Sequence, residues 1–400
     1  KVHGSPLGAE ELAGAKAALG IDYPAFEIPA AILDAWRAAG TRSQNLRGEW
    51  EARLAASPKK DEFTRRMSGK LPADFSAAMA EYKQKLAEDK PKVATRKSSQ
   101  MALEVINKAV PETLGGSADL TGSNLTNTPE TLPFQANSRT GRYMMYGIRE
   151  HEMAAAMNGV ALHGGLIPYG GTFMVFTDYA RPAIRLSALM EVRSIYVMTH
   201  DSIGLGEDGP THQPVEHLSA LRAIPNLYVF RPADAMETAE CWELAMEAQK
   251  TPSILALSRQ NLPAVRTEYS AENKSAKGAY SLVGPADADV VIFATGSEVA
   301  IAVEAQKQLA EQGTSARVVS VPSMELFNKQ SDAYKAEIFG SAKARVAVEA
   351  GIEMSWNKLL GDKGRFVGMN SFGASGPIDA LYSHFGITAK AVVEAATAQL

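Results

Sequence analysis

The sequence predicts an α/β protein with two sheet-containing domains that follow a helical amino-terminal stretch. From about residue 92 to 264, short apolar runs alternate with helical segments, which is the pattern of a parallel sheet covered by helices on both faces. The alternation returns at 278–400 after a polar connection, and there predicts a second sheet that is parallel or mixed. A chain of 400 residues is also too long for one ordinary core.

Residues 1–91 have helical patterns without a core of their own. A helix is expected at 9–19, stopped where Gly20 tolerates a left-handed conformation, and another at 61–67. A third has an apolar stripe at helical spacing, formed by Phe75, Met79, Tyr82 and Leu86. We expect this stretch to be a helical linker laid over a neighbouring domain.

The first α/β domain is expected to hold strands at 143–148, 194–199, 227–230 and 253–257, and helices at 152–162, 173–190, 214–222 and 235–249. The second is expected to hold strands at 289–294, 316–321 and 344–348, with a helix at 298–312. Ligands of such sheets bind where the strands end and the loops begin.

Composition excludes several classes of function. The 41 basic and 45 acidic side chains leave a net charge of -4, which argues against nucleic acid as a partner. No apolar run is long enough for a membrane span, and no signal-peptide pattern opens the chain. The single cysteine, Cys241, cannot form an internal disulfide and predicts a reducing, cytoplasmic setting.

The segment from Ile195 to Gln213 is the first candidate site. An apolar strand leads into a glycine-containing loop that carries His200, Asp208 and His212. A long solvated turn is the plain alternative. A zinc site is disfavoured, because no cysteine accompanies the histidines and their spacing fits no common ligand pattern.

Two arginines have positions that suit either phosphate binding or a surface salt bridge. Arg259 ends the strand at 253–257, and Arg96 precedes a helix; a guanidinium suits bidentate phosphate recognition, although each alone is more typical of a surface salt bridge. Asp119 and Ser123 lie in a segment whose glycines and hydroxyls are suited to hold polar ligand groups.

Three further features have both a functional and a structural interpretation. Glu150 starts a helix after a strand, where an acid can face a buried cavity or simply cap the helix. Phe173, Phe176 and Tyr179 share one face of the next predicted helix, where core packing is the default. The turn 294–298 resembles an anion site at a helix amino terminus, but a purely structural turn is favoured.

Six motifs in order resemble those of the transketolase family. The most specific is Gly204-Leu-Gly-Glu-Asp-Gly-Pro-Thr-His-Gln213, preceded by Thr199-His-Asp-Ser-Ile. The others are His3-Gly-Ser-Pro-Leu-Gly8, Thr95-Arg-Lys-Ser, Gly115-Gly-Ser-Ala-Asp, Gly147-Ile-Arg-Glu150 and Ser258-Arg-Gln-Asn. The resemblance runs over essentially the whole chain.

The resemblance implies an enzyme of the pentose phosphate pathway that uses thiamine diphosphate and Mg²⁺ or Ca²⁺. It would move a two-carbon ketol group from a ketose phosphate such as xylulose 5-phosphate to ribose 5-phosphate or erythrose 4-phosphate, and act as a homodimer. Residues 1–91 would be the end of a diphosphate-binding domain and a linker, 92–264 a pyrimidine-binding domain, and 278–400 the carboxy-terminal domain.

The resemblance also implies roles for residues. Glu150 would hydrogen-bond the pyrimidine N1′ of the cofactor, with Phe176 stacked on that ring, Phe173 and Tyr179 shaping its pocket, and Asp119 and His3 also in contact. The expected catalytic residues are Glu150, His3, His200 and His212. The expected substrate-binding residues are His3, Arg96, Ser123, His200, Asp208, His212 and Arg259.

The Gly-Asp-Gly motif that holds the metal and diphosphate in this family does not occur; the nearest sequence is Gly361-Asp-Lys-Gly364. We therefore expect that the chain lacks the amino-terminal diphosphate-binding domain and the metal ligands, and is inactive alone. Close alternatives are 1-deoxyxylulose-5-phosphate synthase and dihydroxyacetone synthase. A non-catalytic binding module of the same fold is a different class of alternative, which the joint presence of Glu150, His200, His212 and Arg259 disfavours.

Overall fold

The computed structural model describes residues 2–400, which form two compact units: the first extends to Phe63 and the second runs from Thr64 to Leu400. The first unit contains α1 (Ala9–Ala18), α2 (Ala30–Thr41) and α3 (Gln44–Ala55), none of which has a buried residue. Gly20 has φ of +67°, which confirms the predicted stop of the first helix. Between residues 2 and 400, every helix is too short or too polar to cross a membrane.

The predicted apolar stripe covers the first sheet domain. After α4 (Lys60–Met67), helix α5 (Phe75–Asp89) buries Phe75, Met79, Tyr82 and Leu86. Their side chains pack in one core with residues of α6 (Thr95–Ala109) and α11 (Ala235–Glu247). The stripe is therefore core, as its spacing indicated.

The central sheet of this domain has six strands, all parallel, in the order β3-β2-β4-β5-β7-β6. The strands are β2 (Thr113–Ser117), β3 (Tyr143–Met145), β4 (Ile167–Phe173), β5 (Ile195–Thr199), β6 (Tyr228–Phe230) and β7 (Ser253–Leu257). Alternate side chains of β5 enter different cores: Val197 packs with α5, α6 and α11, whereas Met198 packs with the helices of the opposite face.

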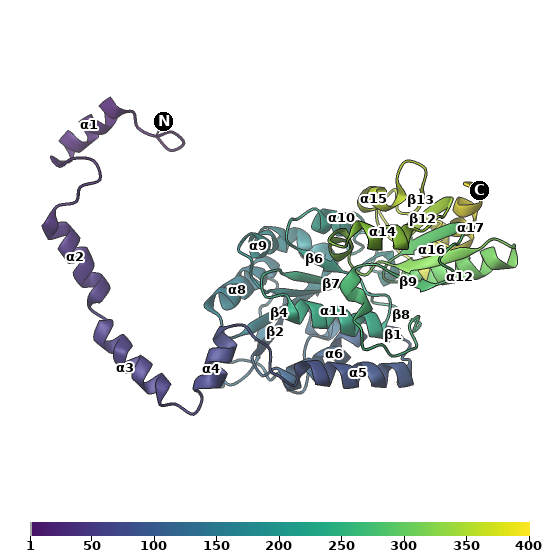
Figure 1. The fold of residues 1–400 in the computed structure, drawn as a ribbon, viewed down its shortest axis with the longest axis horizontal. Helices are drawn as coiled ribbons and strands as arrows, with labels where there is room; N and C mark the ends of the chain where they lie inside the picture. The colour runs from purple at the N-terminus through teal and green to yellow at the C-terminus, as the bar shows by residue number, and fades with distance from the viewer. Residues whose placement is uncertain (1) are drawn as a thin grey trace. The chain divides into compact units, whose positions relative to one another are not determined.

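Those opposite helices are α8 (Glu150–His163), α9 (Thr177–Leu189) and α10 (His217–Arg222). In Figure 1, α5 and α6 lie below the sheet, and α8 and α9 lie on its other side. Both faces are covered, which confirms the predicted doubly covered parallel sheet. Short elements complete this region: α7 (Thr121–Asn124), η1 (Met174–Phe176) and η2 (Ile203–Leu205).

Three local predictions are wrong. Phe173 is the last residue of β4 and not part of a helix; α9 begins only at Thr177, after the turn η1. The strand predicted at 143–148 ends at Met145. Helix α10 begins at His217, three residues after the predicted start, because Gln213–Val215 are held in an irregular buried segment.

The carboxy-terminal domain has a mixed sheet in the order β13-β12-β10-β11-β9, with β9 antiparallel at one edge. Its strands are β9 (Tyr280–Val283), β10 (Val290–Ala294), β11 (Ala316–Ser320), β12 (Ala344–Glu349) and β13 (Arg365–Gly368). One face carries α12 (Glu298–Glu311), α16 (Ile378–His384) and α17 (Ala389–Thr397). The other carries α13 (Met324–Asn328), α14 (Asp332–Phe339), η4 (Glu353–Trp356) and α15 (Asn357–Leu360).

A small ladder closes the first sheet domain. Strand β1 (Val93–Ala94) pairs antiparallel with β8 (Asn261–Leu262), so Val93 lies opposite Leu262. The turn η3 (Lys274–Lys277) then leads into the second domain. The chain therefore leaves the first domain beside the point where it entered.

Candidate active site

The predicted site residues of the second unit follow strands of the parallel sheet. Phe173 ends β4, His200 follows β5, Arg259 follows β7, and Asp119 follows β2. Because all six strands are parallel, these residues lie at one edge of the sheet. Strands β3 and β4 lie on opposite sides of β2, so the direction in which strands are added reverses there. In open α/β sheets, ligands bind in the crevice at such a reversal.

Aromatic rings line this edge. The rings of Phe173 and Phe176 are stacked, with centroids 5.8 Å apart and planes 11° from parallel. Next to them, the imidazole of His212 meets Phe176 edge to face at 5.7 Å, and Tyr179 lies 5.8 Å from Phe176. Tyr179 is largely exposed, whereas Phe173 is buried. This wall offers flat apolar faces to a heteroaromatic ring.

His200 is a buried, neutral imidazole. Its pKa is lowered to about 3, first by burial and then by the positive charges of Arg96 and Arg259. Nδ1 lies 2.8 Å from the hydroxyl of Thr199, which itself accepts a hydrogen bond from Asn124 Nδ2 at 2.7 Å. The Thr199 hydroxyl can donate its hydrogen to Nδ1, and in that tautomer Nε2–H of His200 is a donor.

The two arginines are held side by side by the residues that precede them. Thr95 N donates to Ser258 Oγ at 3.0 Å, and Ser258 N donates to Thr95 Oγ1 at 2.7 Å. These reciprocal bonds join the start of α6 to the end of β7, so Arg96 and Arg259 become neighbours. The pKa of Arg96 is lowered by burial and by the positive charge of Arg259.

No carboxylate of residues 2–400 lies within ion-pair distance of Arg96 or Arg259. Arg96 Nη1 instead donates to the backbone carbonyl of Ser123 at 2.9 Å. Two half-buried cations without a counter-charge suit an anion, since their mutual repulsion is otherwise unfavourable. The surface-salt-bridge interpretation of these arginines is therefore excluded for the described chain.

The remaining predicted residues differ in burial. Glu150 is buried at the first position of α8, so it follows β3 as predicted. Ser123 is half-buried in α7, directly beside Arg96. Asp119 and Asp208 are exposed, and Asp119 has a left-handed φ of +61°. His3 is exposed and belongs to the first unit.

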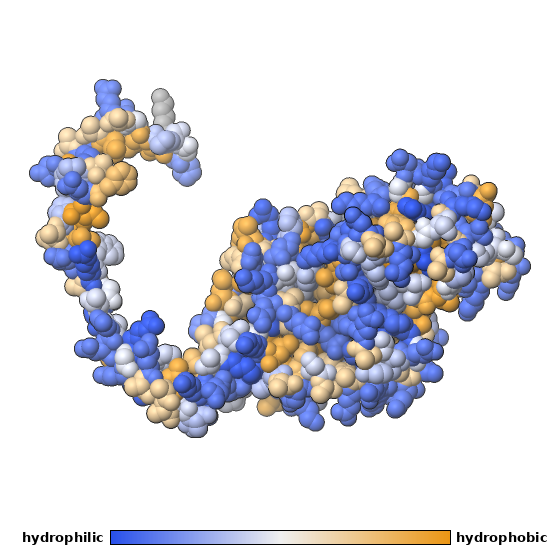
Figure 2. Space-filling view, in the orientation of Figure 1, coloured by the Kyte–Doolittle hydropathy of each residue, from blue (hydrophilic) through white to orange (hydrophobic). Residues whose placement is uncertain are grey.

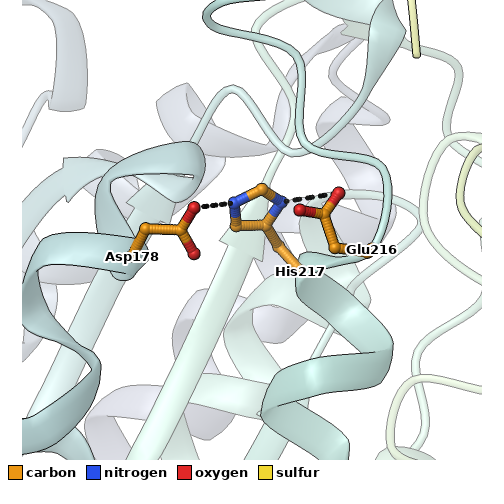
Figure 3. Close-up of side chains that lie close together, drawn as sticks. All are labelled: Asp178, Glu216 and His217. Carbon is orange, nitrogen blue, oxygen red and sulfur yellow. Dashed lines mark ion pairs between the residues drawn. The ribbon is translucent and has the colours of Figure 1, made fainter.

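Asp178, Glu216 and His217 form a further cluster, and they are the only group of three such side chains in residues 2–400 that could hold a metal ion. Figure 3 shows the imidazole of His217 between the two carboxylates, with Nε2 3.2 Å from Asp178 Oδ2 and Nδ1 3.7 Å from Glu216 Oε2. The lone pairs of the two ring nitrogens diverge, so one ion can take only one of them. The arrangement resembles an imidazole held between two carboxylates more closely than three ligands directed at one metal ion.

The sequence did not reveal the residues that support this edge. Thr199 and Asn124 hold Nδ1 of His200 through a chain of two hydrogen bonds, and Arg231 binds Asp201 in the next position of the loop. The asparagine and Arg231 carried no local signal, because each acts on a residue at least 30 positions away.

Three domain models of one family match the chain. Residues 91–265 match the transketolase pyrimidine binding domain, residues 278–388 the transketolase-like carboxy-terminal domain, and residues 1–72 the transketolase thiamine diphosphate binding domain. The last match corrects the expectation that the thiamine diphosphate domain is lacking. It also removes the basis for placing the metal ligands in a missing domain.

Relatives match over nearly the whole chain. The transketolase of Cereibacter sphaeroides is 57% identical over 398 residues, which cover 99% of this chain and 60% of the relative. Among solved structures, the transketolase of Leishmania mexicana has a TM-score of 0.90 at 42% identity and covers 100% of this chain and 59% of its own. A Pichia stipitis transketolase in complex with sedoheptulose-7-phosphate has the same TM-score and identity, with coverages of 100% and 59%.

The chain thus spans about 60% of the length of the curated relatives that it matches. Within that span, the matches include the glycine-containing histidine loop, the paired arginines and both sheet domains. By these three domain matches and the shared fold, the chain belongs to the transketolase family.

Proposed function

We propose that this chain provides the pyrimidine-binding and sugar-phosphate-binding part of a thiamine-diphosphate-dependent transketolase. The observation that carries the proposal is the pair of uncompensated guanidiniums, Arg96 and Arg259, beside the buried neutral His200. The pair suits a phosphate dianion, and the Nε2–H of His200 suits an uncharged sugar oxygen. The reaction would be transfer of a two-carbon ketol group from a ketose phosphate to an aldose phosphate.

The aromatic wall fits the cofactor's pyrimidine ring. Phe176 would stack on that ring with Phe173 behind it, because the faces of these two rings are already nearly parallel, and the tilted ring of Tyr179 would lie at the rim. Glu150 would hold the pyrimidine N1′ through its carboxyl group, while Asp119 and His3 would also contact the cofactor. When bound, thiamine diphosphate supplies the electron sink for the two-carbon unit, and the protein supplies orientation and charge.

The substrate would lie across the histidine loop. Arg96, Ser123, His200 and Arg259 would surround its phosphate, and Asp208 would accept a hydrogen bond from a hydroxyl. His200, His212 and His3 would hold or move protons at hydroxyl and carbonyl oxygens, with His200 acting as a neutral donor. The bound sedoheptulose-7-phosphate of the Pichia stipitis relative supports a sugar phosphate as the ligand class. The expected donor is xylulose 5-phosphate, and the expected acceptors are ribose 5-phosphate and erythrose 4-phosphate.

We also propose a homodimer, the family's Mg²⁺ or Ca²⁺ as second cofactor, and a cytoplasmic location. Figure 2 shows apolar side chains gathered over α8 and α9. The exposed large apolar residues there are Ile148, Leu162, Tyr179, Leu186, Leu189 and Met190. A patch of this kind marks an interaction surface more often than a monomer's solvent face. The proposed domain division is 1–91, 92–264 and 278–400.

The test uses ketol transfer from xylulose 5-phosphate to ribose 5-phosphate with thiamine diphosphate and Mg²⁺. It is run on the 400-residue chain and on a chimera in which the amino-terminal remainder of the Cereibacter sphaeroides relative precedes it. The chimera is expected to be active, and formaldehyde is expected to be a poor acceptor. An inactive chimera beside an active relative would overturn the proposal, and a preference for formaldehyde would indicate the dihydroxyacetone synthase alternative.

A further inference from the structure

The guanidinium of Arg231 is fully buried between the two sheet domains. Towards the first domain, Nε donates to Asp201 Oδ2 at 2.9 Å. Towards the second, Nη1 binds the carboxylate of Glu298 and the Thr295 carbonyl, the latter at 2.9 Å, and Nη2 donates to Ser297 Oγ at 3.2 Å. Although burial lowers the pKa of Arg231, the surrounding carboxylates hold it well above its ordinary value.

The turn 294–298 is built around this arginine. The turn had two interpretations in the sequence, an anion site or a structural turn, and the structure places a cation there. Gly296 has φ of +57°, and a Cβ at that position would lie 2.8 Å from the Arg231 side chain, so glycine is required both by conformation and by space. Gly296 N also donates to the carbonyl oxygen of Arg231 at 3.0 Å.

The other end of Arg231 holds the residue next to His200. His200 has φ of +61°, a conformation that costs a side-chain-bearing residue about 1 kcal/mol and persists only when its neighbours hold it. Its predecessor is fixed by the bond to Asn124, and its successor, Asp201, by the bond to Arg231. The left-handed turn that aims His200 at the anion site is therefore clamped on both sides.

A second attachment lies further along the same loop. Gln213 Nε2 donates to the carbonyl of Gly206 at 3.0 Å and to that of Ala374, in the second domain, at 2.9 Å. A Cβ at Gly373 would meet Gln213 Oε1 at 1.8 Å, so a glycine is needed for this contact. The carboxy-terminal domain thus reaches the histidine loop on either side of its glycines, through Arg231 next to His200 and directly, at Gln213, next to His212.

We infer that Arg231 is a positioning residue through which the carboxy-terminal domain holds the histidine loop in its ligand-binding conformation. This inference rests on the proposed function, because only that function makes this loop conformation the ligand-binding one. The conformation itself is seen in the structure. It assigns a task to residues 278–400, which contribute none of the predicted site residues. Loosening the Arg231–Asp201 bond should let His200 turn away from Arg96 and Arg259 while both domains stay folded.

The experiment follows the His200 imidazole by NMR in the 400-residue chain, with the signal assigned by a His200→Gln variant. In the parent chain, a pKa of about 3 means that the His200 signal does not titrate between pH 5 and 8. In Asp201→Ala, the signal is expected to titrate with a midpoint above 5, and inorganic phosphate is expected to bind at least about tenfold more weakly. Asp201→Asn keeps an oxygen acceptor for Arg231 and should restore both readouts.

The matched control is Glu240→Ala. Glu240 forms an equally buried ion pair with Arg266, at 2.6 and 2.8 Å, which does not touch the histidine loop. The control should lower the unfolding temperature without changing the His200 titration. An unchanged His200 signal and phosphate affinity in Asp201→Ala, or the same change in Glu240→Ala, would overturn the inference.

If Asp201→Ala does not fold, a second variant removes the contact that Arg231 makes with the carboxy-terminal domain. Glu298→Ala removes the acceptor that α12 offers to Arg231 Nη1 and is expected to shift the His200 midpoint in the same direction. A folded Glu298→Ala chain with an unshifted signal also overturns the inference. These readouts need no ketol transfer, so an inactive chimera would refute the proposed function and leave them interpretable.

Discussion

The imidazole of His200 lies against the ring of Phe173, with the two centroids 3.7 Å apart and the planes inclined by 33°. Phe173 ends β4 and His200 follows β5, its neighbour in the sheet, so the contact is a direct result of parallel pairing. One ring belongs to the wall proposed for the cofactor and the other to the site proposed for the phosphate. The contact therefore places the two proposed binding sites next to each other.

The lowered pKa of His200 predicts a pH dependence of stability. Its folded-state pKa of about 3 lies below the ordinary 6.5, so the unfolded chain binds more protons between those values and stability falls as the pH falls through them. When the pH is lowered from 7 to 5, the free energy of unfolding of the parent chain should fall by ~2 kcal/mol more than that of His200→Gln. Urea unfolding at both pH values measures this, and the exposed His163→Gln variant should behave like the parent; an equal loss in all three chains would contradict the prediction.

Arg259→Gln should weaken phosphate binding. It removes one of the two cations of the anion site, and a hydrogen bond to a charged group contributes about 1.5–3 kcal/mol, or roughly a 10- to 150-fold change in affinity. The dissociation constant of inorganic phosphate, measured by calorimetry, is the readout. Arg139→Gln, at an exposed position, is the control and should leave it unchanged. If the two variants bind phosphate alike, Arg259 is not a phosphate ligand.

Glu150→Gln should abolish most of the ketol transfer of the active chimera. The amide cannot take the role of a carboxyl at the cofactor's ring nitrogen, and loss of positioned acid–base groups typically lowers rates by about 100-fold or more. Glu152→Gln, two residues along the same helix but exposed, should retain activity. Equal rates for the two variants would remove Glu150 from the catalytic residues.

Cys241 should be inert in the folded chain. It is fully buried in α11, and burial raises the pKa of its thiol well above the ordinary value, so little thiolate forms. A thiol reagent should therefore titrate no cysteine in native protein and one after denaturation. Rapid labelling of the native chain would show that α11 opens far more readily than its packing implies.

The sequence predicted well those strands whose own residues form a continuous apolar run. For 253–257 the predicted and observed bounds agree, because the whole run is apolar or small and buried on both faces. Strands β2 and β4 were missed, since Gly115, Gly116, Gly170 and Gly171 are atypical of strands. The structure gives a reason for the glycine at position 115: a Cβ at Gly115 would lie 2.4 Å from Tyr169, so the glycine accommodates a large neighbouring side chain.

Missing β4 also caused the error at Phe173. As a helical residue, Phe173 was expected to share a face with Phe176 and Tyr179. As the end of a strand followed by a tight turn, it stacks on Phe176 and also lies against His200. The arginine pair was indicated by position at strand and helix ends, but its lack of counter-charge needed coordinates. Arg231 was beyond prediction, because its partners are 30 and 67 residues away.

The pairing of β1 with β8 has a consequence for how this protein can be rearranged. Val93 and Leu262 are opposite partners, so a cut before the first and after the second would release a body whose two ends are adjacent. Adjacent ends suit circular permutation with a short connector, or insertion into a loop of another host, provided that α5, which packs in the same core, is supplied with the body.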